Sequence, residues 1–441
     1  MSEAIRTPFW LKDNFAPTPD EVSTSSLEVT GTIPADLQGR YLRTGPNPMS
    51  GPTEHWFLGD GMIHGIELAE GKANWFKSRL IQTPMLDGVE GDNYFAKAMQ
   101  SLEHGLGNTH VIGHAGRILA LEELHHPFEM TPELDTVGPY DFGGKLGTGM
   151  TAHPKICPKT GELLFFAYGL APPYLTYHRV DAKGELVQSE VIEVGAATMV
   201  HDFNITENYV IFMDLPVMFD LSKAGEGGIP LAWSDDYGAR LGVMPREGSN
   251  ADVVWYEIDP CYLFHPVNAY EEGDAIVIDT CRFDHFMKPG VPPVPTLLTR
   301  WTIDTVAGTV DEKRLMDVPV EFPRVPDSLV GRKHRYGYMV HMRDDVPAGL
   351  GILKYDFEAE KSTEFRLEPG EFCGEPVFAP RENANSEDDG YLLFYTYDEG
   401  TNTSDFVVLD AREPEQGPIA RVGLGVRVPF GFHGSWIADA G

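Results

Sequence analysis

The sequence is poor in cysteine and in basic residues, and each shortage excludes a class of protein. Its four cysteines, Cys157, Cys261, Cys281 and Cys373, are scattered over 441 residues and form no CxxC pair. A disulfide framework and a cysteine zinc site are therefore not expected. The 34 lysines and arginines stand against 67 acidic residues, which gives a formal net charge of −33. We expect no nucleic-acid partner, because phosphate backbones are bound by basic patches.

Long apolar runs are also absent. The first residues, MSEAIRTPFWLKDNFAP, carry an early acid and no apolar core, so no signal peptide is expected. The most apolar stretch, LLFFAYGLAPPYL at 163–175, is too short and too rich in proline and glycine to span a bilayer. We therefore expect a cytoplasmic protein. Any membrane contact would have to be peripheral and apolar, because the net charge opposes docking on anionic lipid.

Helical periodicity is scarce, and most of the chain consists of short β-runs between Gly, Asn and Pro. Several runs share one form, in which alternating apolar residues end in an acid and a turn. Examples are VVWYEIDP, TRWTIDTVAGTV and ILKYDFEAEKSTEF. Their intervals are compatible with four-stranded blades of roughly 50 residues. The sequence therefore predicts an all-β fold, a seven-bladed β-propeller formed as one domain by residues 1–441.

Two longer segments, residues 219–247 and 286–298, lack a strand pattern and are predicted to be inserts. They are rich in Pro and Gly, yet they carry Leu, Trp, Met and Phe. They could simply cap one face of the propeller. They could instead line a tunnel for an apolar ligand or dip into lipid, because loops on a rigid scaffold often carry function. In either case we expect a cap of loops and short helices over the axis.

Four of the fifteen histidines stand at expected strand boundaries beside Pro, Asp or Gly. They are His153 in TAHPKIC, His201 in MVHDFN, His265 in FHPVNAY and His433 in GFHGSW. Their separations are roughly one blade, one blade and three blades, so a propeller would bring equivalent positions together at its axis. Four imidazoles suit Fe, Cu, Zn or Ni, and a nitrogen-only site with open positions favours iron that binds O₂. The alternative is four ordinary core histidines.

Three glutamates in apolar strand contexts favour the metal site. They are Glu123 in LALEELHHP, Glu321 in VPVEFPR and Glu375 in CGEPVFAPR. A neutral imidazole ligand needs an acceptor for its second ring nitrogen, and this acceptor fixes the tautomer and the ring direction. Each glutamate alone could be an edge-strand acid that faces water. Three of them beside four unusual histidines strengthen the metal-site interpretation beyond what either set supports alone.

Eight stretches occur in the order that is typical of the carotenoid cleavage oxygenases, from about residue 28 to the C-terminus. They are GRYLRTGPNP, HWFLGDGMIHGI, TAHPK, MVHDF, FHPVNAYEEGD, EFPR, GEPVFAPR and VPFGFHGSW. The chain therefore resembles this family over nearly its whole length. The resemblance implies a seven-bladed propeller with one Fe(2+) on its axis and no carboxylate ligand. The implied ligands are His153, His201, His265 and His433.

The resemblance also implies the residues around these ligands. Glu123, Glu321 and Glu375 would lie behind the histidines. Glu122 is the neighbour of Glu123, and Pro127, four residues beyond Glu123, matches the family pattern and selects Glu123. Thr109 in GNTHV resembles the small residue that blocks an open iron position near O₂.

The activity that the resemblance implies is that of a non-heme iron dioxygenase, an oxidoreductase that cleaves a conjugated C=C bond with O₂ to give two carbonyl products. The residues agree with it, because no GxGxxG stands between a strand and a helix to bind a flavin or nicotinamide. The electrons must then come from the substrate. The apolar loops would admit a long conjugated molecule and exclude water.

Carotenoids or apocarotenoids are the expected substrates, and stilbenoids or phenylpropenes are the alternative. The phenolic branch of the family typically has a lysine directly before the first glutamate, where this chain has Glu122. A carboxylate there would repel a phenolate. A non-catalytic binding propeller would leave the glutamates without a purpose, and a calcium-dependent hydrolase would need oxygen ligands. An isomerase on the same scaffold stays open at this point.

Overall fold

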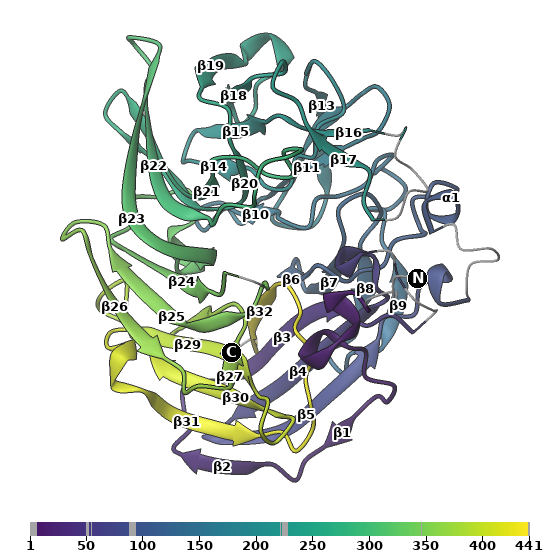
Figure 1. Ribbon diagram of the computed structural model, residues 1–441, viewed down its shortest axis with the longest axis vertical. Coiled ribbons are helices and arrows are strands. Elements are labelled where there is room, and N and C mark those ends of the chain that lie inside the picture. Colours follow the sequence, from purple (N-terminus) through teal and green to yellow (C-terminus); the bar gives the residue numbers. More distant parts are fainter. Residues whose placement is uncertain are drawn as a thin grey trace, which may run out of the picture.

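Strands dominate the computed structural model, which describes residues 7–49, 53, 55–87, 94–220, 222, 228–344 and 346–439. Its described strands form seven blades in a ring, as Figure 1 shows. The first blade contains β1 (Ser23–Thr24), β5 (Lys72–Leu80), β4 (Gly61–Ala69), β3 (Gly39–Pro46) and β32 (Gly434–Ala438). The second contains β6 (His110–His114), β7 (Arg117–Leu121), β8 (Phe128–Met130) and β9 (Thr136–Pro139). The third contains β10 (Lys155–Ile156), β11 (Leu163–Tyr168), β12 (Leu175–Val180) and β13 (Leu186–Val191).

The remaining blades follow in chain order. The fourth contains β14 (Asn204–Ile205), β15 (Tyr209–Asp214), β18 (Ala239–Pro245) and β19 (Val254–Ile258). The fifth contains β20 (Tyr262–Glu272), β21 (Ala275–Phe283), β22 (Leu297–Asp304) and the first part of β23 (Thr309–Arg324). The sixth contains the end of β23, β24 (Tyr336–Met342), β25 (Gly349–Asp356) and β26 (Lys361–Arg366). The seventh contains β28 (Val377–Pro380), β29 (Gly390–Asp398), β30 (Thr403–Asp410), β31 (Pro418–Gly423) and β2 (Glu28–Gly31), and β27 (Glu371–Cys373) links β25 to β29.

The hydrophobic core lies between neighbouring blades. Phe166 and Tyr177 of the third blade pack with Phe203 and Phe212 of the fourth. Inner and middle strands are covered on both faces, so β11 is buried at every position. The outer strand β13 alternates between half-buried and exposed positions, because only one of its faces meets a neighbour. This difference explains why the sequence shows both alternating and continuously apolar β-runs.

Both ends of the described chain close the ring. The N-terminal strand β2 pairs with β31 of the last blade, and the C-terminal strand β32 pairs with β3 of the first blade. Gly431 and Gly434 permit this second contact. A Cβ at Gly431 would lie 2.7 Å from the Thr44 carbonyl oxygen, and a Cβ at Gly434 would lie 2.6 Å from the Leu42 carbonyl oxygen. The C-terminal segment is therefore anchored in the first blade.

The segment at 219–247 corrects one prediction. Residues 221 and 223–227 lie outside the described residues, but the rest contains β17 (Leu231–Trp233) and β18. β17 forms a hairpin with β16 (Val217–Phe219), and β18 is a full member of the fourth blade. β18 contains Gly242, which interrupts the apolar pattern of a strand. A side chain does not fit there, because a Cβ at Gly242 would lie 2.6 Å from the Trp255 ring. The 286–298 segment contains no strand before Leu297.

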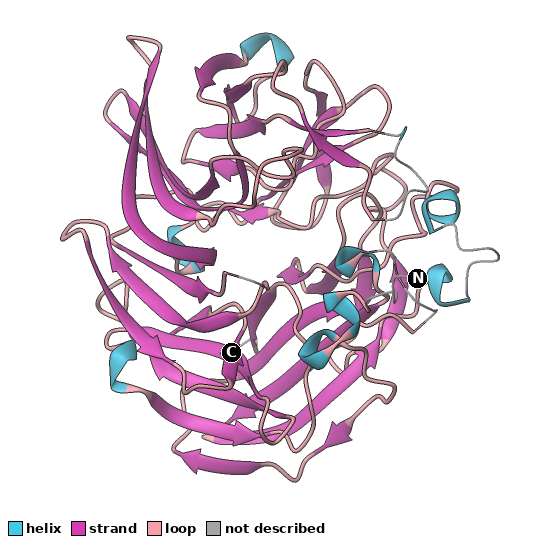
Figure 2. Cartoon of the chain, in the orientation of Figure 1, coloured by secondary structure: helices cyan, strands magenta, loops and turns pink. Residues whose placement is uncertain are grey.

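Several of the short helices lie beside the N-terminus at the right of the ring in Figure 2, and others lie at its top and left. The one α-helix among the described residues is α1 (Tyr94–Ala98). The 3₁₀ turns are η1 (Phe9–Leu11), η2 (Asp13–Phe15), η3 (Trp56–Leu58), η4 (Pro84–Asp87), η6 (Asn250–Asp252), η7 (Asp327–Leu329) and η8 (Pro414–Gln416). In the part of the chain that the structure describes, no helix is both long and apolar enough to cross a membrane.

Two truncations test the closure of the ring. A chain that ends at Ala438 keeps β32, whereas a chain that ends at His433 leaves the buried strand β3 without this partner. We expect the shorter chain to melt roughly 10 °C lower, because it loses several backbone hydrogen bonds of about 1 kcal/mol each. Circular dichroism melting curves measure the difference. Equal melting temperatures would show that β32 does not hold the ring together.

Candidate metal centre

The inner strands of the seven blades bring one polar residue each to the axis. Each of these residues lies within an inner strand or within three residues of its start. In blade order from the second blade to the first, they are Thr109, His153, His201, His265, Glu321, Glu375 and His433. These seven residues therefore meet because they occupy equivalent places in different blades, whereas the predicted Glu123 reaches His201 from the segment after β7.

The four histidines form one compact cluster. Their ligand atoms all lie within 4.8 Å of one another, and all four side chains are buried. The Nε2 atoms of His201 and His265 are 3.1 Å apart. The ring centroids of His153 lie 4.5 Å from those of both His201 and His433. The arrangement presents several imidazole nitrogens to one small volume.

Most of these imidazoles are held neutral. Burial and the neighbouring imidazoles lower the pKa of His153 and His433 well below the ordinary value. The same causes lower the pKa of His265 to about 3. Burial opposes the charge on His201 as well, but the Glu123 carboxylate raises the pKa of His201 above its ordinary value. Neutral imidazole is the form that binds a metal.

Each of three histidines has a glutamate behind it. Nδ1 of His265 lies 2.5 Å from Oε2 of Glu321, and Nδ1 of His433 lies 2.9 Å from Oε1 of Glu375. Nδ1 of His201 contacts Oε1 of Glu123. These contacts leave the Nε2 atoms of the three rings for a metal.

His153 is the exception among the four. Its Nδ1 lies 3.7 Å from Oδ2 of Asp202, whose other oxygen lies 2.8 Å from Nζ of Lys155. Its Nε2 is buried without a hydrogen-bond partner. A buried polar atom without a partner destabilises a fold unless a ligand occupies the position. This atom and the chemistry of the four nitrogen donors fit a transition-metal ion.

The buried carboxylate of Glu321 also favours a cation nearby. Burial raises the pKa of Glu321 to about 8, so nearby positive charge is needed to keep this group ionised at neutral pH. A metal ion held by the imidazoles supplies that charge. The charges at the site therefore balance only when the Glu321 carboxylate, the imidazoles and the metal ion are taken together.

Sequence reasoning missed two residues at the centre. Asp202 directly follows His201 in the MVHDFN motif and is buried, but nothing local indicates that it faces His153. Tyr168 donates a hydrogen bond to Oε2 of Glu123, and its ring lines the cavity described next. The sequence contains one indication of Tyr168. It ends the buried strand LLFFAY, and a buried tyrosine hydroxyl needs a hydrogen-bond partner.

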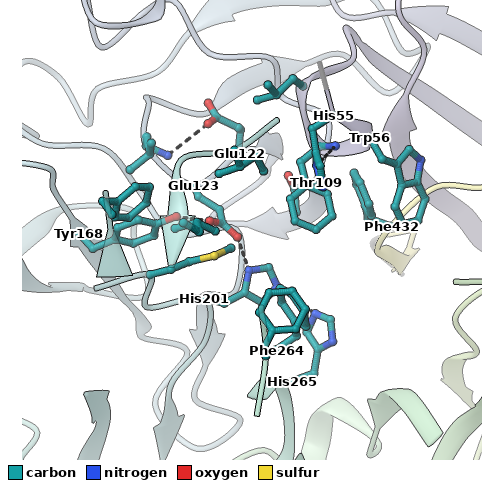
Figure 3. A pocket seen from close by; sticks show the side chains of 18 of the residues that line it. His55, Trp56, Thr109, Glu122, Glu123, Tyr168, His201, Phe264, His265 and Phe432 are labelled. Carbon is teal, nitrogen blue, oxygen red and sulfur yellow. Dashed lines mark hydrogen bonds and ion pairs between the residues drawn. The ribbon is translucent and has the colours of Figure 1, made fainter. Parts of the chain in front are cut away.

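A cavity of about 1080 Å³ opens onto the histidines, and Figure 3 shows part of its wall. His201, His265 and His433 line it, as does Thr109. Its aromatic wall includes Phe57, Phe264, Phe286, Phe322 and Phe432. Residues from both predicted inserts, among them Phe219, Leu231, Pro293 and Val294, also line it. The volume and the apolar wall are those of a site for a large hydrophobic small molecule.

Thr109 is fixed beside the cluster by its neighbours. Its hydroxyl donates to Oδ1 of Asn108 over 2.9 Å, and its carbonyl oxygen accepts from the backbone N–H of His433 over 3.0 Å. The Asn108 amide donates in turn to the carbonyl oxygens of Phe57 and Gly59. Thr109 therefore links the second blade to the ring-closing segment at the mouth of the histidine cluster.

Comparison with known proteins agrees with this architecture. The family described as retinal pigment epithelial membrane protein matches residues 15–438. The carotenoid cleavage oxygenase of Mycobacterium tuberculosis is 38% identical, and the alignment covers 97% of each chain.

Solved structures match over similar lengths. The lignostilbene dioxygenase of Pseudomonas brassicacearum superposes with a TM-score of 0.91 at 29% identity, over 99% of this chain and 100% of that one. A variant of the Synechocystis apocarotenoid oxygenase superposes with a TM-score of 0.88 at 28% identity, over 98% of both chains.

Replacing one histidine tests the cluster. We expect His433→Ala to lose bound metal almost completely, because it removes one of the four nitrogen donors. The measurement is the metal content of the purified protein, together with the rise in melting temperature when Fe(2+) is added anaerobically. His114→Ala is the control, because His114 contacts the Gly161 carbonyl and lies outside the cluster. Retention of metal by His433→Ala would exclude it as a ligand.

The glutamate behind His433 should have a smaller effect. Glu375→Gln keeps the shape of the side chain but removes the charge that faces Nδ1. We expect metal affinity to fall roughly 10- to 100-fold, less than for His433→Ala. Competition with a calibrated chelator measures the affinity. An unchanged affinity would mean that the 2.9 Å contact does not orient the imidazole.

Proposed function

This chain belongs to the retinal pigment epithelial membrane protein family, which includes the carotenoid cleavage oxygenases, and on that premise we propose that it cleaves a conjugated C=C bond of a carotenoid or apocarotenoid. The co-substrate is O₂, and the products are two carbonyl compounds. The observation that carries the proposal is a cluster of four buried histidines that opens onto a large apolar cavity.

The proposed cofactor is one Fe(2+), held by His153, His201, His265 and His433. When bound, iron supplies the redox chemistry by which O₂ reacts with an electron-rich alkene. The protein's own contribution is orientation and charge. Glu321 and Glu375 hold the rings of His265 and His433 in one direction.

The cavity wall binds and shields the substrate. Its phenylalanines offer apolar and aromatic surface to a polyene, whose burial is favourable by roughly 25 cal/mol per Å² of apolar surface. Exclusion of water also protects the reacting bond from side reactions. We assign Thr109 to the space where O₂ reaches the centre, because it lines the cavity and contacts the backbone of His433.

Stilbenoids are the second candidate substrates, because a lignostilbene dioxygenase superposes closely on this chain. The cavity favours the polyene. Glu122 lines it, and among the described lining residues there is no lysine to bind a phenolate. We also propose a cytoplasmic protein whose membrane contact is peripheral and apolar. Phe9 and Met99 support this contact, since both are exposed and line the cavity.

One experiment tests the reaction and the metal together. Protein with a measured iron content is incubated with O₂ and either β-carotene, an apocarotenal or resveratrol, and the products are identified by mass spectrometry. We expect near-stoichiometric iron and aldehydes from a polyene. Chelation should abolish turnover, and added Fe(2+) should restore it where Zn(2+) does not. Cleavage of resveratrol alone would select the second candidate, and a protein that binds no iron would refute the proposal.

A further inference from the structure

The apolar cavity contains a Glu–His pair that the metal centre does not use, in addition to Arg343 and Asp344, which also line it. Glu122 and His125 both line the cavity, and Oε2 of Glu122 lies 2.6 Å from Nδ1 of His125. Figure 3 shows the carboxylate of Glu122 turned away from that of Glu123, which faces His201. The two adjacent glutamates therefore have different tasks.

His125 links Glu122 to the end of α1. Its second nitrogen, Nε2, donates to the Ala98 carbonyl oxygen over 3.1 Å. Both ring nitrogens thus face acceptors, which suits the imidazolium form. Burial opposes this charge, but the Glu122 carboxylate and the Ala98 carbonyl raise the pKa of His125. The pair is an ion pair fixed to the C-terminal end of α1.

One oxygen of Glu122 keeps its acceptor capacity. Oε2 is engaged by His125, whereas Oε1 makes only a long contact of 3.4 Å with the backbone N–H of Leu124. A carboxylate oxygen can accept more than one hydrogen bond. The Glu122 side chain is 12% exposed, and it belongs to the cavity wall. A ligand in the cavity can therefore reach a charged acceptor.

The chemistry of the ligand decides whether this contact is favourable. A pure hydrocarbon would remove water from the carboxylate without replacing the lost hydrogen bond, which is unfavourable. A neutral hydroxyl would replace that bond. A phenolate would add a second negative charge and be repelled.

We propose that Glu122, held by His125, accepts a hydrogen bond from a hydroxyl group on the end ring of the polyene, so that the enzyme prefers hydroxylated substrates. The proposal rests on the proposed function and narrows its substrate class. Glu122 is a specificity residue in this scheme, and the bond-cleaving chemistry stays at the histidine cluster.

The test compares kcat/KM for a ring-hydroxylated apocarotenal and for its unhydroxylated analogue. Wild-type protein should prefer the hydroxylated compound about tenfold or more, the range of a hydrogen bond to a charged group. Glu122→Leu should lose this preference, and Glu122→Gln, which keeps an acceptor without the charge, should retain part of it. Glu103→Leu is the matched control, because Glu103 is an exposed acid of a neighbouring loop outside the cavity wall.

Iron content and melting temperature are measured for every variant, so that a folding defect is separated from a change in preference. Equal kcat/KM values in the wild type would overturn the proposal whatever the variants do. A preference that survives in Glu122→Leu and Glu122→Gln would overturn it as well. If the wild type cleaves neither polyene, the proposed function fails instead. Preferential cleavage of para-hydroxystilbene over stilbene, with no preference among polyenes, would show that the recognised hydroxyl belongs to a phenol. This result would refute the polyene assignment.

Discussion

The pairing of β32 with β3 is the interaction on which the metal centre depends. It ties the C-terminus into the first blade and delivers His433 to the axis. The same segment carries the Gly434 N–H, which donates to Oε2 of Glu375 over 2.9 Å. His433 also donates its backbone N–H to Thr109. Closure of the ring therefore also assembles this part of the site, because His433 and its partners come from the first, second and seventh blades.

Electrostatics sets the second requirement. Burial favours neutral imidazoles, which are good ligands, but it also disfavours the ionised form of Glu321, which orients His265. A cation at the centre reconciles the two, since it stabilises the Glu321 carboxylate and binds the imidazoles. His153 fits the same logic, because its Nε2 has no protein partner and its acid, Asp202, is shared with Lys155.

The cavity combines apolar binding with a minority of polar groups, among them the Glu122–His125 pair. Most of its wall is aromatic or aliphatic, so it selects ligands by size and hydrophobicity. Such a wall discriminates little between different end groups of a ligand. The Glu122–His125 pair, next to Glu123 in the chain, places a charged acceptor in this mostly apolar wall. A largely buried carboxylate in a mostly apolar wall discriminates between ligands, since an unmatched polar group costs more than a missing apolar contact.

The sequence alone predicted the all-β class, the propeller and the residues that meet at its axis. Its β-runs were clear, and His153, His201, His265 and His433 stood in short, ordered motifs. It failed at β17 and β18, where glycine and proline hide strands whose pairing is decided by neighbours such as Trp255. Which carboxylate serves which imidazole was decided only by the tertiary structure. Tyr168 reaches Glu123, and Asp202 lies opposite His153, because packing of separate blades brings together groups that are far apart in the chain. Local sequence carries the strand pattern, but burial and hydrogen-bond partners arise only when the ring is closed.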